Sequence, residues 1–116
     1  MNGAEFKVLR ESLGLSLAWL AQRWGLESER GPKRWQERNE PIPDARAADM
    51  EQLAAIADGL VEWQLTELLT DAAGDRRLLV PRVDADSPDE FPASFYRAVA
   101  ARVSWELEGR LKIVYR

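Results

Sequence analysis

The stretch LAQRWGLESERGPKRWQERNEPIP, residues 20–43, gives the strongest indication of the fold. Trp35 directly follows Lys33 and Arg34, and further charged residues come after it. A large aromatic side chain is normally hidden from water for most of its surface. We therefore interpret Trp35 as the buried back of a helix whose charged front faces outward.

Two short helices are predicted before this one. In residues 4–14, apolar side chains share one helical face and Gly14 marks the end of the helix. In the next helix, Ser16 is a suitable N-cap and Gly25 a suitable stop. The apolar faces consist of Phe6, Leu9 and Leu13 in the first helix and of Leu17, Leu20, Ala21 and Trp24 in the second.

A third helix is predicted between Ser28 and Arg38. Ser28 has the side chain of an N-cap. Gly31 is an equally good candidate, because the Pro32 that follows it is best tolerated as the first helical residue. The two prolines of NEPIPD, residues 39–44, then end the helix.

The remainder alternates between helix and strand. Asp44 caps a helical region that extends to about Ala72, and its apolar set is wider than one stripe, so the helix either buries two sides or breaks near Gly59. A turn, a strand over residues 76–83, a helix over 92–107 and a strand over 110–116 follow. We predict a mostly α protein. An N-terminal helix-turn-helix bundle spans residues 1–43, and a helical dimerisation region with a short antiparallel strand pair spans residues 44–116.

The amino-acid composition argues against several classes of function. The chain has 116 residues and neither cysteine nor histidine, which removes disulfides, thiolate chemistry and the commonest general base and metal ligand. It has no phosphate-binding loop and no isolated carboxylate pair that suggests an acid and a base, so we expect neither an enzyme nor a cofactor. It has no membrane-spanning apolar run and no signal peptide, which predicts a cytoplasmic protein.

The net charge of −4 is unevenly distributed. Residues 1–43 carry seven basic and six acidic side chains, whereas residues 44–75 carry one and eight. Within the first part, five basic side chains lie between positions 22 and 38: Arg23, Arg30, Lys33, Arg34 and Arg38. The alternative to a binding face is a helical bundle whose charges are simply solvated. The coincidence of these charges with the outermost helix favours double-stranded DNA as the partner.

The order of helix, glycine turn and helix meets the physical needs of a DNA-reading helix-turn-helix. Ala21 is small where another helix crosses, Gly25 can adopt a left-handed turn, and Trp35 anchors the second helix of the pair. The series of Leu20, Ala21, Gly25 and Trp35 resembles the Cro/repressor (XRE-like) family. More narrowly, WQERNEPIP with its preceding spacing is similar to the anti-CRISPR-associated phage autorepressors and their bacterial relatives of the YdiL type.

The resemblance implies a homodimer that binds an inverted repeat in a promoter, often its own, and represses it. It covers the order of elements along nearly the whole chain, but its specific part is about 25 residues long. By position, it places Arg30, Lys33 and Arg34 on the recognition helix and Ser28 at its cap. Two departures are Leu17, which stands where many relatives have a phosphate-contacting glutamine, and Gly31-Pro32, which is unusual within a recognition helix.

These inferences define a predicted site at the start of the third helix, where side chains would read base edges in the major groove. Arg30 and Arg34 are the candidates for guanine, Lys33 and Arg38 would read or anchor, and Arg23 would touch the DNA backbone only. The full predicted set is Arg23, Ser28, Glu29, Arg30, Lys33, Arg34 and Arg38. One short helix reads few bases, so a dimer is expected, and no small-molecule effector is evident.

Two other classes compete with this prediction. A protein–protein module, such as an antitoxin or adaptor, would be favoured by an exposed Trp19 or Trp63 without a basic stripe. An enzyme would require a deep polar pocket.

Overall fold

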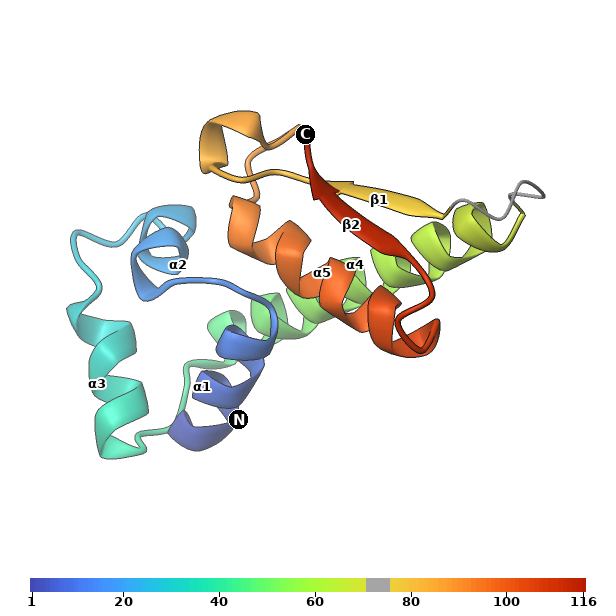
Figure 1. Cartoon of the computed structure of the whole chain (residues 1–116). Helices are drawn as coiled ribbons and strands as arrows, with labels where there is room; N and C mark the ends of the chain where they lie inside the picture. The colour runs from blue at the N-terminus through green and yellow to red at the C-terminus, as the bar shows by residue number, and fades with distance from the viewer. Residues whose placement is uncertain (71–75) are drawn as a thin grey trace. The chain divides into compact units, whose positions relative to one another are not determined.

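The computed structural model describes residues 1–70 and 76–116, and the chain forms two compact units, Met1–Ala54 and Ala55–Arg116. The structure is mostly helical, with one small sheet near the C-terminus (Figure 1). The division between the units lies within α4 (Asp44–Leu69), so the start of this helix belongs with the N-terminal unit. In the described part of the chain, no helix has the length and apolar character needed to cross a membrane.

The N-terminal unit begins with three short helices: α1 (Gly3–Ser12), α2 (Leu17–Arg23) and α3 (Arg30–Arg38). Asn2 and Glu5 form a capping box at the start of α1, and the predicted cap of α2 is confirmed because Ser16 Oγ accepts a hydrogen bond from the Trp19 amide at 3.0 Å. The predicted stops are confirmed as well. Gly14 and Gly25 both have a φ of 66°, a left-handed conformation that few other residues adopt without strain.

Three aromatic rings form the centre of this unit. Phe6 of α1 lies 5.9 Å from Trp35 of α3 and 6.4 Å from Trp24, which follows α2, and the two tryptophan rings are 6.1 Å apart. The other buried apolar side chains of this unit are those of Leu13, Leu15, Leu20, Ala21, Ile42, Met50 and Leu53. The interpretation of Trp35 as the inner side of its helix is therefore confirmed, although its side chain is only partly buried.

The long helix α4 is continuous through Gly59, so the predicted alternative of a break there is wrong, and the fully buried residues do not form the two buried sides of the other alternative. Its buried side chains follow a single stripe of Met50, Leu53, Ala57, Val61 and Leu68, and residues on either side of that stripe are half-buried. The helix begins at Asp44, and the Pro43 carbonyl accepts its first hydrogen bonds, so the capping position is one residue earlier than predicted. The predicted end near Ala72 and the turn after it lie outside the described residues.

The C-terminal unit corrects one prediction about topology. Strands β1 (Arg77–Val80) and β2 (Lys112–Tyr115) pair in parallel, not antiparallel. A single-turn 3-10 helix, η1 (Asp84–Asp86), and helix α5 (Ala93–Glu106) lie between the strands in sequence. Helix α5 carries the chain back along the sheet, so that β2 starts at the same end as β1 (Figure 1). A short hairpin turn would have given the antiparallel pair.

The aromatic cluster generates a prediction about stability. Trp35→Ala removes a ring that contacts both Phe6 and Trp24. Because Trp35 is partly exposed, we expect a loss of about 3 kcal/mol in the free energy of unfolding, at the low end for aromatic truncations. Urea denaturation of the full chain measures it, with Val8→Ala as the control, since Val8 of α1 is 70% exposed. Unchanged stability in Trp35→Ala would show that the ring is not an anchor.

Candidate nucleic-acid interface

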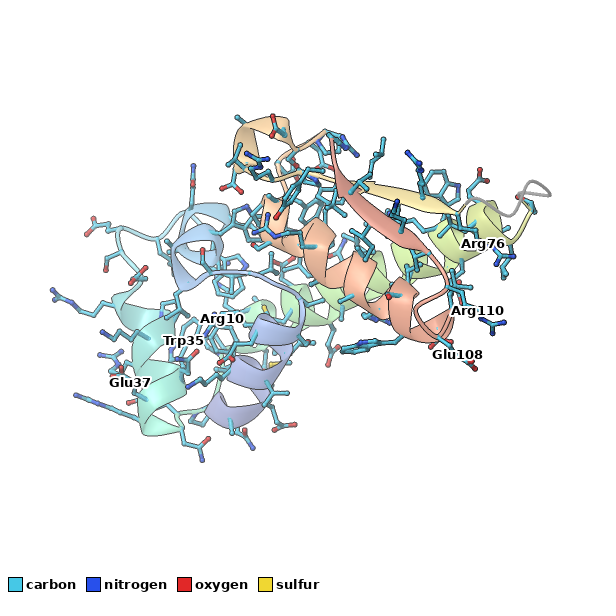
Figure 2. The ribbon with its side chains drawn as sticks, viewed as in Figure 1. Arg10, Trp35, Glu37, Arg76, Glu108 and Arg110 are labelled. Atoms are coloured by element: carbon cyan, nitrogen blue, oxygen red, sulfur yellow. The ribbon has the colours of Figure 1, made fainter. Side chains whose placement is uncertain are left out.

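Helix α3 has an inner face that is buried or partly buried and an outer face that is exposed. Pro32 is buried, and Trp35 and Gln36 are partly buried on the inner side. Figure 2 shows Trp35 on the side of α3 toward α1 and Glu37 on the outer side. The outer face, which we call the α3 front, consists of the exposed residues Arg30, Lys33, Arg34, Glu37 and Arg38. The front thus carries four basic side chains and one acidic side chain, as a surface for an anionic partner requires.

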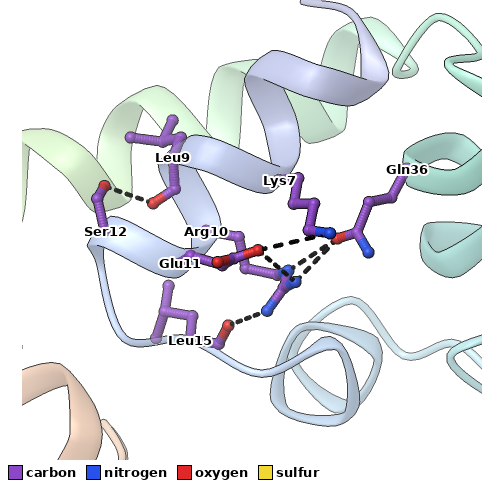
Figure 3. Close-up of polar contacts among 7 residues, drawn as sticks. All are labelled: Lys7, Leu9, Arg10, Glu11, Ser12, Leu15 and Gln36. Atoms are coloured by element: carbon purple, nitrogen blue, oxygen red, sulfur yellow. Dashed lines mark hydrogen bonds and ion pairs between the residues drawn. The ribbon is translucent and has the colours of Figure 1, made fainter.

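Contacts from α1 fix the orientation of α3. The Arg10 guanidinium donates two hydrogen bonds to Gln36 Oε1, at 3.2 and 2.9 Å, and a third to the Leu15 carbonyl at 3.0 Å (Figure 3). A single side chain therefore ties together α1, the segment after it and the inner face of α3. Sequence reasoning missed Arg10, but a pattern could have revealed it. Arg10 lies at helical spacing between Phe6 and Leu13, on the apolar face of α1.

The backbones of α1 and α3 also approach closely at Gly3. A Cβ atom at this position would lie 2.1 Å from the Trp35 carbonyl oxygen and 2.8 Å from the Asn39 Cα, so only glycine fits there. The Ala4 amide donates to Asn39 Oδ1 at 3.3 Å, and Asn39 ends α3 in a left-handed conformation with a φ of 52°. These contacts position the C-terminal end of α3 against the start of α1.

The basic side chains of the front differ in their partners. Lys33 Nζ lies 3.9 Å from Glu37 Oε1, and Arg34 Nε lies 3.5 Å from Glu40 Oε2. Arg30 and Arg38 are exposed, with no ion-pair partner within residues 1–70 and 76–116. Exposed ion pairs of this kind contribute little to stability. Lys33 and Arg34 can therefore exchange their carboxylate partners for a phosphate at little expense to the fold.

The start of α3 differs from both predicted alternatives. The N-cap position is occupied by Glu29, whose side chain makes no capping hydrogen bond, rather than by Ser28 or Gly31. The Ser28 hydroxyl accepts a hydrogen bond from the Arg30 amide at 3.2 Å instead. Pro32 is the third helical residue, which is tolerated because amides in the first turn have no intrahelical partner. Ser28 and Glu29 are both exposed at this end of the helix.

Arg23 lies in a different environment from the other predicted site residues. Its guanidinium binds Asp49 of α4 through two contacts, Nε to Oδ2 at 2.8 Å and Nη2 to Oδ1 at 3.1 Å, and it lies over the Trp19 ring at 5.7 Å. Its side chain is 25% exposed. A phosphate would have to share this guanidinium with Asp49, so the position of Arg23 favours a structural role over the predicted backbone contact.

Asp49 also receives the indole N–H of Trp24 at 2.7 Å, and Arg46 lies over the Trp24 ring at 5.4 Å. The hydrogen bonds from Arg23 lower the pKa of Asp49 below its ordinary value of 3.8. Burial of the carboxyl group raises this pKa, but the hydrogen bond from Trp24 and the positive charges of Arg23 and Arg46 lower it further. Asp49 is thus ionised near neutral pH and connects the end of α2 to α4.

A scan of the sequence against models of protein families found no match, and a search of curated proteins found none either. The functional interpretation of the α3 front therefore depends on its own geometry and charge.

Asp49→Asn should destabilise the protein by about 1.5–3 kcal/mol near neutral pH, because it removes the charge from two hydrogen bonds with Arg23. The lowered pKa of Asp49 makes this contribution pH-dependent. It is fully present above about pH 5, where the carboxyl group is ionised even in the unfolded chain, and it is lost as the pH falls below 3.8 through the pKa of the folded state.

Thermal and urea unfolding of both proteins from pH 7 to pH 2.5 tests this expectation. Asp58→Asn is the matched control, because Asp58 binds Arg102 at the same 2.8 Å distance but is 64% exposed, and we expect it to change stability little. The stabilities of wild type and Asp49→Asn should converge at low pH. A constant difference across the range would exclude the charge of Asp49 as the cause.

Proposed function

We propose that this protein is a sequence-specific DNA-binding transcriptional regulator, a homodimeric repressor of the XRE-like kind that binds an inverted repeat. The observation that carries the proposal is the α3 front: four basic side chains point outward from a helix whose apolar back is fixed by Phe6 and Trp24. In this interpretation α2, residues 24–29 and α3 constitute the helix-turn-helix. The connection is longer than the usual three or four residues.

In the proposed mechanism, different residues of the α3 front contact the bases and the phosphates. Arg30 and Arg34 contact guanine in the major groove, since arginine presents a fork of donors that matches the N7 and O6 acceptors. Lys33 and Arg38 neutralise phosphates or read adjacent bases, and Ser28 and Glu29 lie at the end of the helix nearest the base edges. Arg23 acts through Asp49, holding α2 and α4 together so that α3 stays in place.

The acidic segment from residue 44 to residue 75 supports selectivity in this proposal. Like charges repel a duplex from any orientation that brings this segment close, so the α3 front is the favoured point of approach. Specific binding is then steeply dependent on salt, while non-specific binding is weak. Because each helix reads few bases, a second copy of the protein binds the other half-site of the DNA. The two half-sites lie about one turn of DNA apart, roughly 34–36 Å.

A second candidate is a protein–protein module such as an antitoxin or adaptor. Trp63 of α4 is 61% exposed and Trp105 of α5 is 76% exposed, and large exposed aromatic side chains are common at protein interfaces. Trp19, in contrast, is only partly exposed and lies under Arg23. The α3 front favours DNA as the partner of the N-terminal unit, and the two exposed tryptophans favour a protein surface in the C-terminal unit.

Two lysines allow a matched test of the front. Lys33 pairs with Glu37 and Lys7 pairs with Glu11, both at 3.9 Å and four residues apart, with lysine exposures of 57% and 55%. Lys33→Ala should weaken binding to all duplexes and reduce the salt slope by roughly one unit. Lys7→Ala should leave both unchanged. Fluorescence anisotropy with the DNA upstream of the gene and with a random-pool duplex measures the two quantities.

Arg30→Ala and Arg34→Ala should each cost about 1–3 kcal/mol on the specific site and relax the base preference there. If no duplex binds at low salt, or if loss of Arg30, Lys33 and Arg34 together changes nothing while the protein stays folded, the DNA proposal is wrong.

A further inference from the structure

The sheet of the C-terminal unit is incomplete. It has two strands within the described residues, so β2 has a neighbour on one edge and none on the other. Two-stranded sheets are marginally stable alone, and parallel strands usually lie within larger, covered sheets. The open edge of β2 therefore presents backbone groups that are suited to another strand.

The hydrogen bonds to β1 show which backbone groups face this edge. The Lys112 amide donates to the Arg76 carbonyl at 2.8 Å, and the Arg116 amide donates to the Val80 carbonyl at 3.1 Å. Alternate residues of a strand direct their backbone groups to opposite sides. The N–H and C=O groups of Leu111, Ile113 and Tyr115 therefore face the open edge.

The side chains of two of these residues, Ile113 and Tyr115, are largely apolar and poorly covered. Ile113 is 41% exposed and Tyr115 is 55% exposed, although the register places them beside Leu78 and the buried Val80. They border an apolar groove of about 550 Å³, which is lined on the α5 side by Arg97, Ala100 and Ala101. The exposed Trp105 lies one helical turn beyond Ala101. The groove thus combines small side chains on α5 with an unpaired strand edge.

We propose that β2 pairs antiparallel with β2 of a second copy, around a two-fold axis that passes between the two Ile113 residues. The pairing joins the two sheets into one of four strands and places apolar side chains of each copy at the groove of the other. This inference rests on the homodimer of the proposed function and assigns its interface to residues 111–115. A two-fold axis satisfies both open edges with the same segment, which a small ligand could not do.

Charge selects the register. With the axis at Ile113, Leu111 of one copy lies opposite Tyr115 of the other, and Lys112 lies opposite Val114. An axis at Lys112 would place the Lys112 residues of the two copies opposite each other. An axis at Val114 would place Lys112 of one copy opposite Arg116 of the other. Both registers are unfavourable because like charges in directly opposite positions are destabilising. In the chosen register Arg110 falls opposite Arg116 outside the strands, where Glu108 lies 3.5 Å from Arg110. Each pair of outward-facing residues exchanges two hydrogen bonds.

Cysteine cross-linking tests the register directly, because the chain contains no cysteine of its own. In a hydrogen-bonded antiparallel pair the Cα atoms are about 5.5 Å apart, within the range that a disulfide spans. Ile113→Cys in the full chain should therefore form a covalent dimer almost completely under mild oxidation. Leu79→Cys is the control, since Leu79 is 54% exposed but lies on β1, away from the proposed axis.

A charged side chain placed at the two-fold axis provides a second test of the interface. Ile113→Lys places two like charges opposite each other and should weaken dimerisation at least tenfold by sedimentation equilibrium, whereas Leu79→Lys should leave the dimer intact. Circular dichroism verifies that both variants fold. A monomeric wild type, a dimer that tolerates Ile113→Lys, or cross-linking no greater at position 113 than at position 79 would overturn the proposed interface.

Both tests are made without DNA. Cross-linking at position 113 in a protein that binds no duplex would support the interface and remove the proposed function. A dimer that binds DNA but does not cross-link there would remove only the interface.

Discussion

The bond between Asp49 and the end of α2 is the interaction on which the N-terminal unit depends. One carboxylate receives the Arg23 guanidinium and the Trp24 indole N–H, at distances between 2.7 and 3.1 Å. These charge-assisted bonds hold Trp24 in place, and Trp24 in turn contacts both Phe6 and Trp35. A polar contact that α3 does not make itself thus contributes to the position of this helix.

In this arrangement the inner face of α3 is fixed by several contacts, whereas the side chains of its outer face can exchange their ion-pair partners. On the inner side, the Trp35 ring, the Arg10–Gln36 hydrogen bonds and the close approach at Gly3 fix the helix at several points along its length. On the outer side, the contacts are ion pairs of 3.5 and 3.9 Å between exposed groups. Replacing those pairs with phosphate contacts would leave the contacts of the core intact, as a surface that binds an anionic polymer requires.

The sequence predicted the features that depend on local chemistry. Ser16, Gly14 and Gly25 define helix ends through contacts within one or two turns, and Trp35 identified the inner face of α3 because its neighbours are charged. The bond between Arg23 and Asp49 joins residues 26 positions apart, which no local pattern indicates. The parallel pairing of β1 and β2 was missed for a related reason, since it depends on the path of the chain through α5 rather than on the strands themselves.

Two-dimensional ¹⁵N–¹H NMR during titration with a short duplex can locate the surface of this protein that binds DNA, which we propose to be the α3 front. The amides of residues 28–38 should shift progressively, and the five tryptophan indole N–H signals act as separate reporters within the same spectrum. We predict a small shift for the Trp35 indole and none for those of Trp63 and Trp105. Shifts confined to Trp63 and Trp105, with residues 28–38 unchanged, would show that DNA does not bind at the α3 front.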